Sequence, residues 1–370
     1  MTELRDQLQG TLGAAYSLER ELGGGMSHVF VATETAHGRR VVVKVLPPEL
    51  VGSVNMERFR REVQLAAGLQ HPNIVPVLAA GEMDGVPYYT MPFLGGPSLR
   101  ERLRDTGALP LADAVSILRD VARALGYAHA LGVVHRDIKP DNVLFDGAVA
   151  MVTDFGIAKA LSSSSAVSGR TSLTMSGMSV GTPAYMAPEQ AASDPAIDHR
   201  ADIYSFGCMA YELFTGTPPF AEVPVHKRLA AQISGAPEPV SSFRPDVPRA
   251  LELLVARCLR TDPAKRPQSA NELTQTLEWA EARRSAQIAM PTALLVPLVM
   301  GKVMMVYLAV VLAVLLLARG AVAWIGLPVW VLSGAMIMMA LGLPFVLFTA
   351  WSHYRARRAA TEAPPSQPHG

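Results

Sequence analysis

The pattern of apolar and polar positions divides the chain into three parts. In the first part, short apolar runs alternate with glycine-rich and polar turns, which is typical of β-strands. One segment there, residues 57–69, instead repeats apolar residues at helical spacing, and Pro72 follows it as a stop. The first part therefore predicts a sheet with one helix, and its strands lie at residues 16–22, 29–33, 39–46 and 86–94.

The second part has the three- and four-residue repeat of amphipathic helices. It also contains short apolar runs that predict strands at 132–134, 143–145 and 150–152. Ahead of both parts, residues 4–15 are weakly amphipathic, and we expect either a short helix or a disordered lead-in there. The predicted helices cover residues 99–103, 111–131, 251–259 and 269–280, and a further buried helix begins at Asp202.

The third part is strongly apolar. Charged side chains are absent between Lys302 and Arg319 and again over residues 320–352. Because a membrane span needs about 20 apolar residues, this part predicts a transmembrane hairpin with helices at 294–318 and 328–352. Basic residues gather at the two ends of the hairpin, and the positive-inside rule then places both ends in the cytoplasm. A soluble pair of apolar helices is the alternative.

Composition adds constraints on class and compartment. The 370 residues have room for about two domains, and the net charge of +1 gives no electrostatic case for binding nucleic acid. Cys208 and Cys258 fall in apolar helical patterns and predict buried free thiols of a reducing compartment. The N-terminus lacks the basic start and apolar core of a signal peptide, so we expect the first two parts to stay in the cytoplasm.

The candidate chemistry lies in a polar loop, His-Arg-Asp-Ile-Lys-Pro-Asp-Asn, at residues 135–142. Its residue types fit phosphoryl transfer: Asp137 can accept the proton of an attacking hydroxyl, and Lys139 can neutralise charge on the transferred phosphate. Asn142 offers an amide oxygen to Mg²⁺, and Asp154 of the following Asp-Phe-Gly supplies a second metal ligand.

These motifs, together with Lys44 and Ala-Pro-Glu at 187–189, resemble in content and order a complete eukaryotic-like serine/threonine protein kinase of the type found in bacteria. A single His-Arg-Asp tripeptide would carry little weight, but the ordered set is specific. The resemblance implies an α+β, bilobal protein kinase fold over residues 16–279, with a small β-rich N-lobe at 16–94 and a larger α-helical C-lobe at 95–279. We expect two transmembrane helices to follow it.

The resemblance also implies an ATP site between the lobes. Lys44 would hold the α- and β-phosphates and pair with Glu62 on the helix at 57–69. Met91 would be the gatekeeper beside the adenine, and Val42 and Leu144 would lie on either side of the ring. The residues implied for ATP binding are Leu22, Gly23, Gly24, Gly25, Val29, Val42, Lys44, Met91, Pro92, Leu94 and Leu144.

The glycine-rich loop departs from the family pattern Gly-x-Gly-x-x-Gly-x-Val. Counted back from Val29, Ser27 takes the third glycine position and Gly24 takes the second. Gly23 is then one residue too close, so the loop is one residue short of the pattern. This is the feature that favours a nucleotide-binding pseudokinase, which signals by conformation, over an active enzyme.

The stretch between Asp-Phe-Gly and Ala-Pro-Glu is rich in serine and threonine, the composition of a flexible loop. By resemblance it is an activation segment, and a phosphate on it would bond to Arg136. Thr182 would lie in the loop that receives the acceptor residue and, with Lys139, points to Ser/Thr rather than Tyr. The candidate regulatory phosphosites are, in order of preference, Thr174, Ser176 and Thr171.

The resemblance gives structural roles to three further residues. Asp202 would brace the backbone of the catalytic loop, and Arg266 would pair with Glu189. The full plan of the chain is a lead-in at 1–15, the kinase domain at 16–279, a juxtamembrane linker at 280–293, transmembrane helices at 294–318 and 328–352, and a basic, then disordered, cytoplasmic tail at 353–370.

The sequence thus predicts a membrane-tethered serine/threonine protein kinase that uses ATP with Mg²⁺ or Mn²⁺ and is activated by autophosphorylation. Its expected partners are protein substrates, the lipid bilayer and a second copy for phosphorylation in trans, but not nucleic acid. It would be a multi-pass protein of the cell membrane with the kinase in the cytoplasm. The alternatives are the pseudokinase and a transport or oligomerisation function of the hairpin itself.

Overall fold

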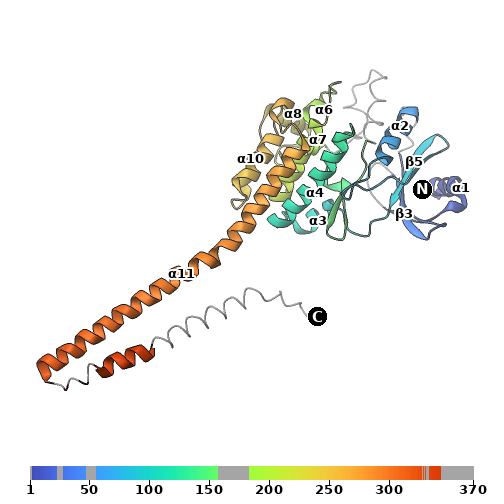
Figure 1. Ribbon diagram of the computed structural model, residues 1–370. Helices are drawn as coiled ribbons and strands as arrows, with labels where there is room; N and C mark the ends of the chain where they lie inside the picture. Colours follow the sequence, from blue (N-terminus) through green and yellow to red (C-terminus); the bar gives the residue numbers. More distant parts are fainter. Residues whose placement is uncertain are drawn as a thin grey trace. The chain divides into compact units, whose positions relative to one another are not determined.

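The computed structural model describes residues 2–22, 28–46, 56–156, 183–326, 328, 330 and 333–342 (Figure 1). The chain forms two compact units, Met1–Ala282 and Arg283–Gly370.

The first unit begins with a five-stranded antiparallel sheet in the order β1-β2-β3-β5-β4. The four strands that the sequence predicted are present. The strand that it did not predict, β4, contains Gly81 and buries only Met83, so its apolar alternation is weak. The strands are β1 (Tyr16–Leu22), β2 (His28–Glu34), β3 (Arg39–Val45), β4 (Ala79–Met83) and β5 (Val86–Pro92).

One helix packs on each face of this sheet, because neighbouring residues of a strand point to opposite faces. Helix α2 (Met56–Ala67) buries Phe59 in the apolar cluster that contains Val42. Helix α1 (Thr2–Leu12) buries Leu8 in the cluster that contains Val43. The weakly amphipathic lead-in is therefore a helix that covers the second face of the sheet.

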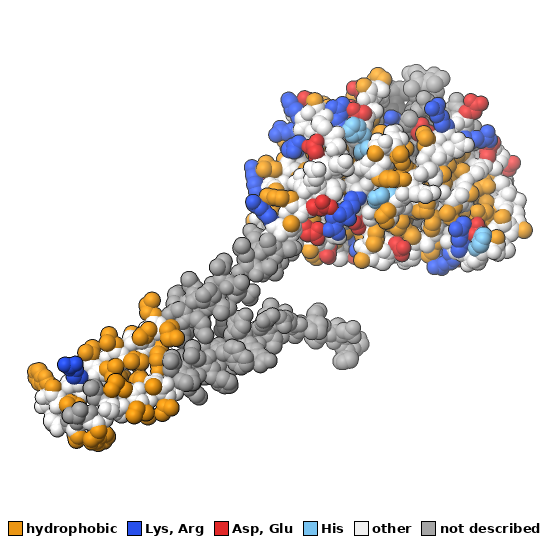
Figure 2. Space-filling model, in the orientation of Figure 1, with side chains coloured by type: hydrophobic (Ala, Val, Ile, Leu, Met, Phe, Trp, Pro, Cys, Tyr) orange, Lys and Arg blue, Asp and Glu red, His pale blue; other side chains and the backbone are white. Residues whose placement is uncertain are grey.

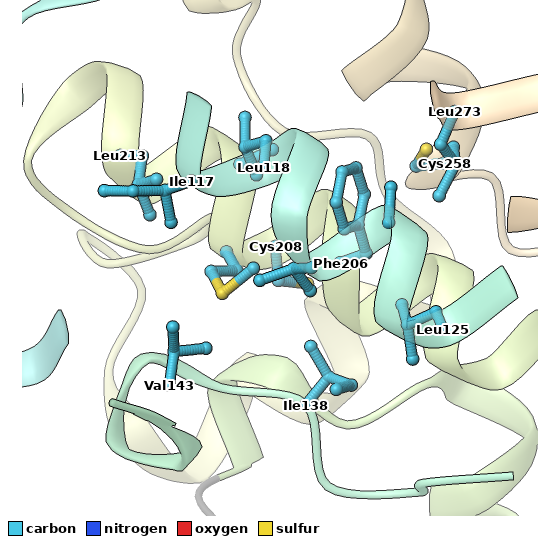
Figure 3. Packing of buried hydrophobic residues seen from close by; sticks show 14 of the residues in the cluster. Ile117, Leu118, Leu125, Ile138, Val143, Phe206, Cys208, Leu213, Cys258 and Leu273 are labelled. Atoms are coloured by element: carbon cyan, nitrogen blue, oxygen red, sulfur yellow. The ribbon is translucent and has the colours of Figure 1, made fainter. Parts of the chain in front are cut away.

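The rest of the first unit is mainly helical. Helix α7 is its centre, since every residue from Ala201 to Phe214 is buried. Figure 3 shows Phe206 and Leu213 of α7 among Ile117 and Leu118 of α4. The helices are α3 (Leu99–Thr106), α4 (Leu111–Ala130), α6 (Pro188–Ala191), α7 (Arg200–Thr215), α8 (Val225–Ser234), α9 (Val240–Phe243), α10 (Arg249–Cys258) and α11 (Ala270–Ile325).

Strands β6 (Val143–Asp146) and β7 (Val149–Val152) form a hairpin beside the catalytic loop. The strand predicted at 132–134 is wrong. Its residues end helix α4 instead, because the amides of Gly132 and Val133 donate to carbonyls of His129 and Ala128. Those amides are therefore not available to a neighbouring strand.

Both cysteines are free and completely buried, as predicted. Cys208 lies in α7 and Cys258 ends α10 (Figure 3). Burial raises the pKa of both thiols, that of Cys258 to about 12.

The second unit contains the remainder of α11, which is helical from Ala270 to Ile325 and so includes the segment predicted as a linker. Within the described ranges, one helix is long and apolar enough to cross a membrane, at Met304–Trp324. Its surface is apolar and exposed, including Met305, Leu316 and Leu317 at 71%, 62% and 74% (Figure 2). A shorter apolar helix follows at Ser333–Gly342, and the Tyr307 hydroxyl donates a hydrogen bond to the Met339 carbonyl.

Candidate active site

The catalytic loop is fixed by a buried carboxylate at the start of α7. Asp202 is fully buried and accepts hydrogen bonds from the backbone amides of His135 (2.8 Å) and Arg136 (2.7 Å). Its Oδ2 also lies 2.8 Å from Nε2 of His129. Burial alone would raise the pKa of Asp202, but the hydrogen bond from His129 and the nearby imidazoles lower it overall. Arg136 has a φ of +69°, a left-handed conformation that this clamp stabilises.

The three candidate catalytic groups of the loop contact one another. The Asn142 amide donates to Oδ2 of Asp137 at 3.0 Å and to its backbone carbonyl at 2.7 Å. The Lys139 ammonium forms an ion pair with the same Oδ2 at 2.7 Å. The Asp137 side chain remains 30% exposed, so its carboxylate is both oriented and accessible to a substrate hydroxyl.

The Asp-Phe-Gly segment at 154–156, the predicted metal loop, follows strand β7 and joins this group. The Thr153 amide donates to the Asn142 carbonyl at 3.0 Å, which brings Asp154 next to the catalytic loop. Asp154 receives the Lys44 ammonium on Oδ2 at 2.6 Å and the Tyr89 hydroxyl on Oδ1 at 2.5 Å. Burial would raise the pKa of Asp154, but the charge and hydrogen bond of Lys44, followed by the bond from Tyr89, lower it overall.

Lys44 therefore pairs with Asp154 in this structure. Glu62, which the resemblance assigned to Lys44, is buried in α2. A Cβ added to Gly156 would lie 3.8 Å from Oε2 of Glu62, so this carboxylate reaches the metal loop. The pairing of Lys44 with Glu62 stays a prediction.

The residues proposed to surround the adenine lie in a single apolar cluster. It joins β1, β2, β3 and β5 to the hairpin of the other lobe, and Met91 and Val42 are among its buried members. Thr153 donates a hydrogen bond to the Met91 sulfur at 3.2 Å, which links the gatekeeper position to the metal loop. The partly buried members include Leu22, Val29, Leu94 and Leu144. Pro92 ends β5 opposite Val41 of β3.

Several predicted residues lie outside the described ranges. These are Gly23, Gly24, Gly25, Thr171, Thr174, Ser176 and Thr182. Of the described neighbours of the activation segment, Arg136 has a buried Nε that makes no hydrogen bond to any described residue. The backbone carbonyl of Arg136 accepts a hydrogen bond from the side-chain amide of Gln190 at 2.8 Å.

Arg266 and Glu189 form an ion pair in the C-lobe. The guanidinium is buried and donates two parallel hydrogen bonds to the carboxylate, at 2.6 and 2.7 Å. Its remaining N–H groups donate to backbone carbonyls of Arg200, Arg260 and Thr261. This pair ties the Ala-Pro-Glu segment to the end of the helical lobe.

The side-chain oxygens of Asp154 and Asn142 suit a hard cation such as Mg²⁺. The described residues contain no group of three or more His, Cys, Asp or Glu side chains that could enclose a metal. Asp154 and Asn142 instead supply one carboxylate and one amide oxygen on adjacent loops. Mg²⁺ is commonly held by few protein oxygens together with substrate phosphates and water, so the residues present fit a Mg²⁺–nucleotide complex.

Sequence reasoning did not identify Tyr89, His129 or Arg100 as members of this region. Tyr89 lies in an apolar strand, where an aromatic residue is ordinary. Its partner Asp154 is 65 residues further along the chain. No local pattern marks such a contact, and only the fold brings the two residues together.

The comparisons with known proteins agree with this geometry. A family model described as a protein kinase domain matches residues 16–278. The chain belongs to the protein kinase family. It is 39% identical over 274 residues to the probable serine/threonine-protein kinase CE0033 of Corynebacterium efficiens, covering 71% of this chain and 41% of that protein. It is 40% identical over 269 residues to the serine/threonine-protein kinase PknD of Mycobacterium tuberculosis, covering 71% and 39%.

A third relative is the serine/threonine-protein kinase PknB of Mycobacterium leprae, 38% identical over 275 residues, covering 72% of this chain and 43% of that protein. All three relatives are bacterial proteins whose names describe them as serine/threonine protein kinases. It spans about two fifths of the length of the curated relatives it matches. The C-terminal unit lies beyond residue 278, where the family match ends.

Proposed function

We propose that the protein transfers the γ-phosphoryl group of ATP to serine and threonine hydroxyls of other proteins. The observation that carries the proposal is the hydrogen-bonded unit of Asp137, Lys139 and Asn142, held by Asp202 next to the Lys44–Asp154 pair. Such an arrangement has no evident structural purpose, because it concentrates charge at a partly exposed position between two lobes.

Each of these charged side chains has a separate function in the proposed reaction. Asp137 orients the acceptor hydroxyl and takes its proton, while Lys139 offsets negative charge on the group being transferred. Lys44 binds the nucleotide phosphates from β3. When bound, Mg²⁺ or Mn²⁺ would neutralise phosphate charge, and Asn142 and Asp154 are the residues that would hold it. Val42, Met91, Leu94 and Leu144 exclude water from the adenine.

The test compares the full-length protein in detergent with its Asp137→Asn variant, using γ-labelled ATP, Mg²⁺ and a generic basic protein substrate. We expect a loss of at least about 100-fold in the variant, since a general base contributes about 10²–10⁴. Asp105→Asn is the matched control, because Asp105 is a surface residue whose side chain is 68% exposed. Equal labelling by wild type and Asp137→Asn would contradict the proposal.

Autophosphorylation of the activation segment is proposed as the route to activity. The support is Arg136, whose buried Nε makes no hydrogen bond to any described residue and can donate one to a phosphate oxygen. Thr174, Ser176 and Thr171 are the proposed phosphosites, and a second copy would phosphorylate them in trans. Mass spectrometry after incubation with ATP would map them. Mixing an active copy with the Asp137→Asn variant tests the trans reaction, because the variant can then be labelled only by its partner.

The C-terminal unit is proposed to be a transmembrane hairpin at 294–318 and 328–352, with a linker at 280–293 and a cytoplasmic tail at 353–370. Its support is the exposed apolar helix at Met304–Trp324 and the hydrogen bond from Tyr307 to Met339 of the following segment. A reporter enzyme fused after residue 370 tests the topology. Cytoplasmic activity supports two spans and a multi-pass protein, whereas activity on the outside would establish a single span.

A pseudokinase is the second candidate, because the glycine-rich loop is one residue short of the family pattern. The two candidates differ in one measurement. A pseudokinase binds ATP but transfers no phosphoryl group to itself or to a substrate, even at high enzyme concentration. Inserting one glycine into the 23–25 run would then restore transfer if loop length were the cause.

A further inference from the structure

Two strands of the N-lobe present a pair of donors to one carboxylate. Lys44 of β3 and Tyr89 of β5 are direct partners in the antiparallel register, so their side chains leave the same face of the sheet. The Lys44 ammonium donates to Oδ2 of Asp154 at 2.6 Å, and the Tyr89 hydroxyl donates to Oδ1 at 2.5 Å. Each oxygen of this carboxylate therefore has its own donor, and the two donors come from neighbouring strands.

Tyr89 is the more deeply buried of the two donors. It is 1% exposed, whereas the side chain of Lys44 is 22% exposed. Burial, followed by the charge of Asp154, raises the pKa of Tyr89 well above its ordinary value of 10.0. The phenol therefore keeps its proton and remains a donor to the carboxylate.

The described surroundings of Asp154 hold only one weaker alternative to this donor. The Thr153 hydroxyl lies 3.3 Å from the same Oδ1, but it has a single proton and also lies 3.2 Å from the Met91 sulfur. The bond from Tyr89 is shorter and goes to an ionised acceptor, which makes it the stronger contact. Among the described residues, Tyr89 is thus the main donor that fixes Oδ1.

The two donors differ in what happens to them when a nucleotide binds. In the proposed function, Lys44 binds the nucleotide phosphates, and its flexible stem allows the ammonium to turn toward them. Tyr89 has no such freedom, because its ring is packed in the apolar cluster that contains Val42 and Met91. Tyr89 is therefore the donor that continues to hold the carboxylate after Lys44 has turned to the phosphates.

We propose that Tyr89 is a positioning residue for the metal ion, because its hydroxyl keeps the Asp154 carboxylate oriented while Lys44 binds the nucleotide phosphates. Hydrogen-bond partners of metal-binding side chains fix their orientation, and the loss of one typically lowers metal affinity about 10–100-fold. This inference rests on the nucleotide and metal site of the proposed function, and it adds to that site a residue that contacts neither ligand itself.

The test measures binding rather than phosphoryl transfer. The full-length protein in detergent is titrated with a non-hydrolysable ATP analogue in EDTA and again in saturating Mg²⁺. The readout is the dissociation constant in EDTA divided by that in Mg²⁺, and for wild type we expect a ratio well above 1. For Tyr89→Phe we expect the ratio to fall about tenfold, or to 1 where the wild-type ratio is smaller than that. The constant in EDTA should stay the same, whereas a purely structural function of Tyr89 would change both constants alike.

Two further variants isolate the cause. Tyr88→Phe is the matched control, because Tyr88 removes the same hydroxyl from the same strand but packs in the cluster on the other face of the sheet. Its ratio should equal that of wild type. The second variant adds Tyr89→Phe to Asp154→Asn. Because Tyr89 acts through Asp154, the double variant should have the same ratio as Asp154→Asn alone.

The outcomes separate the two proposals. A wild type that binds the analogue equally well in EDTA and in Mg²⁺ overturns the inference without any variant, so the test holds even where Tyr89→Phe fails to fold. A folded Tyr89→Phe with the wild-type ratio also overturns it. A protein that shows the expected ratios but phosphorylates no substrate supports the inference and overturns the proposed function.

Discussion

At the scale of the residue, Asp154 shows how a single side chain is held by its neighbours. One of its oxygens accepts from Lys44 and the other from Tyr89, and its backbone has a φ of +68°. This carboxylate is oriented by two donors from two strands of the N-lobe, although it belongs to the other lobe. Tyr89 is therefore a positioning residue that holds the metal-loop carboxylate.

Replacing Tyr89 by phenylalanine should lower the free energy of unfolding by about 1.5–3 kcal/mol, the usual contribution of a hydrogen bond to a charged group. The pKa of Asp154 should rise, because one of the bonds that lowers it is lost. Denaturant unfolding measures the first effect. Tyr88→Phe, at the preceding residue of β5 and with its side chain on the other face of the sheet, should change stability by less than about 0.5 kcal/mol. Equal effects of the two substitutions would contradict the assignment.

Residues also set the limit of what sequence could predict. The motif residues Asp137, Asn142 and Asp154 could be singled out because each belongs to a short ordered pattern. Tyr89 and Arg100 could not, because their partners lie 65 and 112 residues away. Periodicity and motif spacing describe local order, whereas these contacts depend on how the lobes are assembled.

At the scale of the element, α7 is the platform of the C-lobe. Its first turn carries Asp202, which fixes the catalytic loop, and its last turns carry Glu212, which pairs with Arg100 of α3. The sequence predicted a buried helix that begins at Asp202, two residues after the observed start at Arg200. The short segment 132–134 was mistaken for a strand, since an apolar run of three residues does not distinguish a strand from the end of a helix.

Asp202→Asn should make stability less dependent on acid pH. The folded pKa of Asp202 lies below its ordinary value of 3.8, so its charge stabilises the fold above that value. That contribution is lost as the pH falls through the lower folded pKa. In wild type, unfolding free energy should fall steeply as pH drops below about 4, and the variant should begin less stable at neutral pH and fall less. A pH series of denaturant titrations measures this, and parallel curves would contradict it.

The Arg266–Glu189 pair holds the Ala-Pro-Glu segment against the following helices. Glu189→Ala would leave a buried guanidinium without its carboxylate, and we expect a loss of about 3–5 kcal/mol. The matched control is Glu278→Ala, because Glu278 pairs with Arg123 on the surface, where such pairs contribute about 0–1 kcal/mol. Thermal unfolding distinguishes the two, and a small effect at Glu189 would show that the pair is compensated by the carbonyls around Arg266.

At the scale of the whole molecule, the chain combines a kinase unit with an apolar C-terminal unit. The division at Ala282 falls close to the end of the family match at residue 278. The two lobes could be predicted, because the motifs and the periodicity agreed over most of the kinase unit, but β4 was missed and the segment 132–134 was assigned wrongly. The prediction of two membrane-spanning helices in the second unit is supported only in part. The described residues contain one candidate span, and the second predicted helix is described only over Ser333–Gly342.

Ending the chain after Ala282 should yield a protein that leaves the membrane fraction and retains its phosphotransfer activity, because the candidate catalytic groups all lie in the first unit. Fractionation of cells that express both forms, followed by an activity assay, measures both properties. The Asp137→Asn version of the short form serves as the inactive control. A short form that folds but stays with the membrane would show that the kinase unit has its own lipid contacts.

The two cysteines have a practical consequence. Thiolates react with maleimides, but Cys208 and Cys258 are completely buried and their pKa values are raised, so neither presents a nucleophile to solvent. These are the only cysteines in the chain. The natural sequence is therefore already suited to site-directed labelling. A cysteine introduced at Asp105 and a second beyond residue 320 would carry a fluorophore pair whose energy transfer reports the distance between the two units.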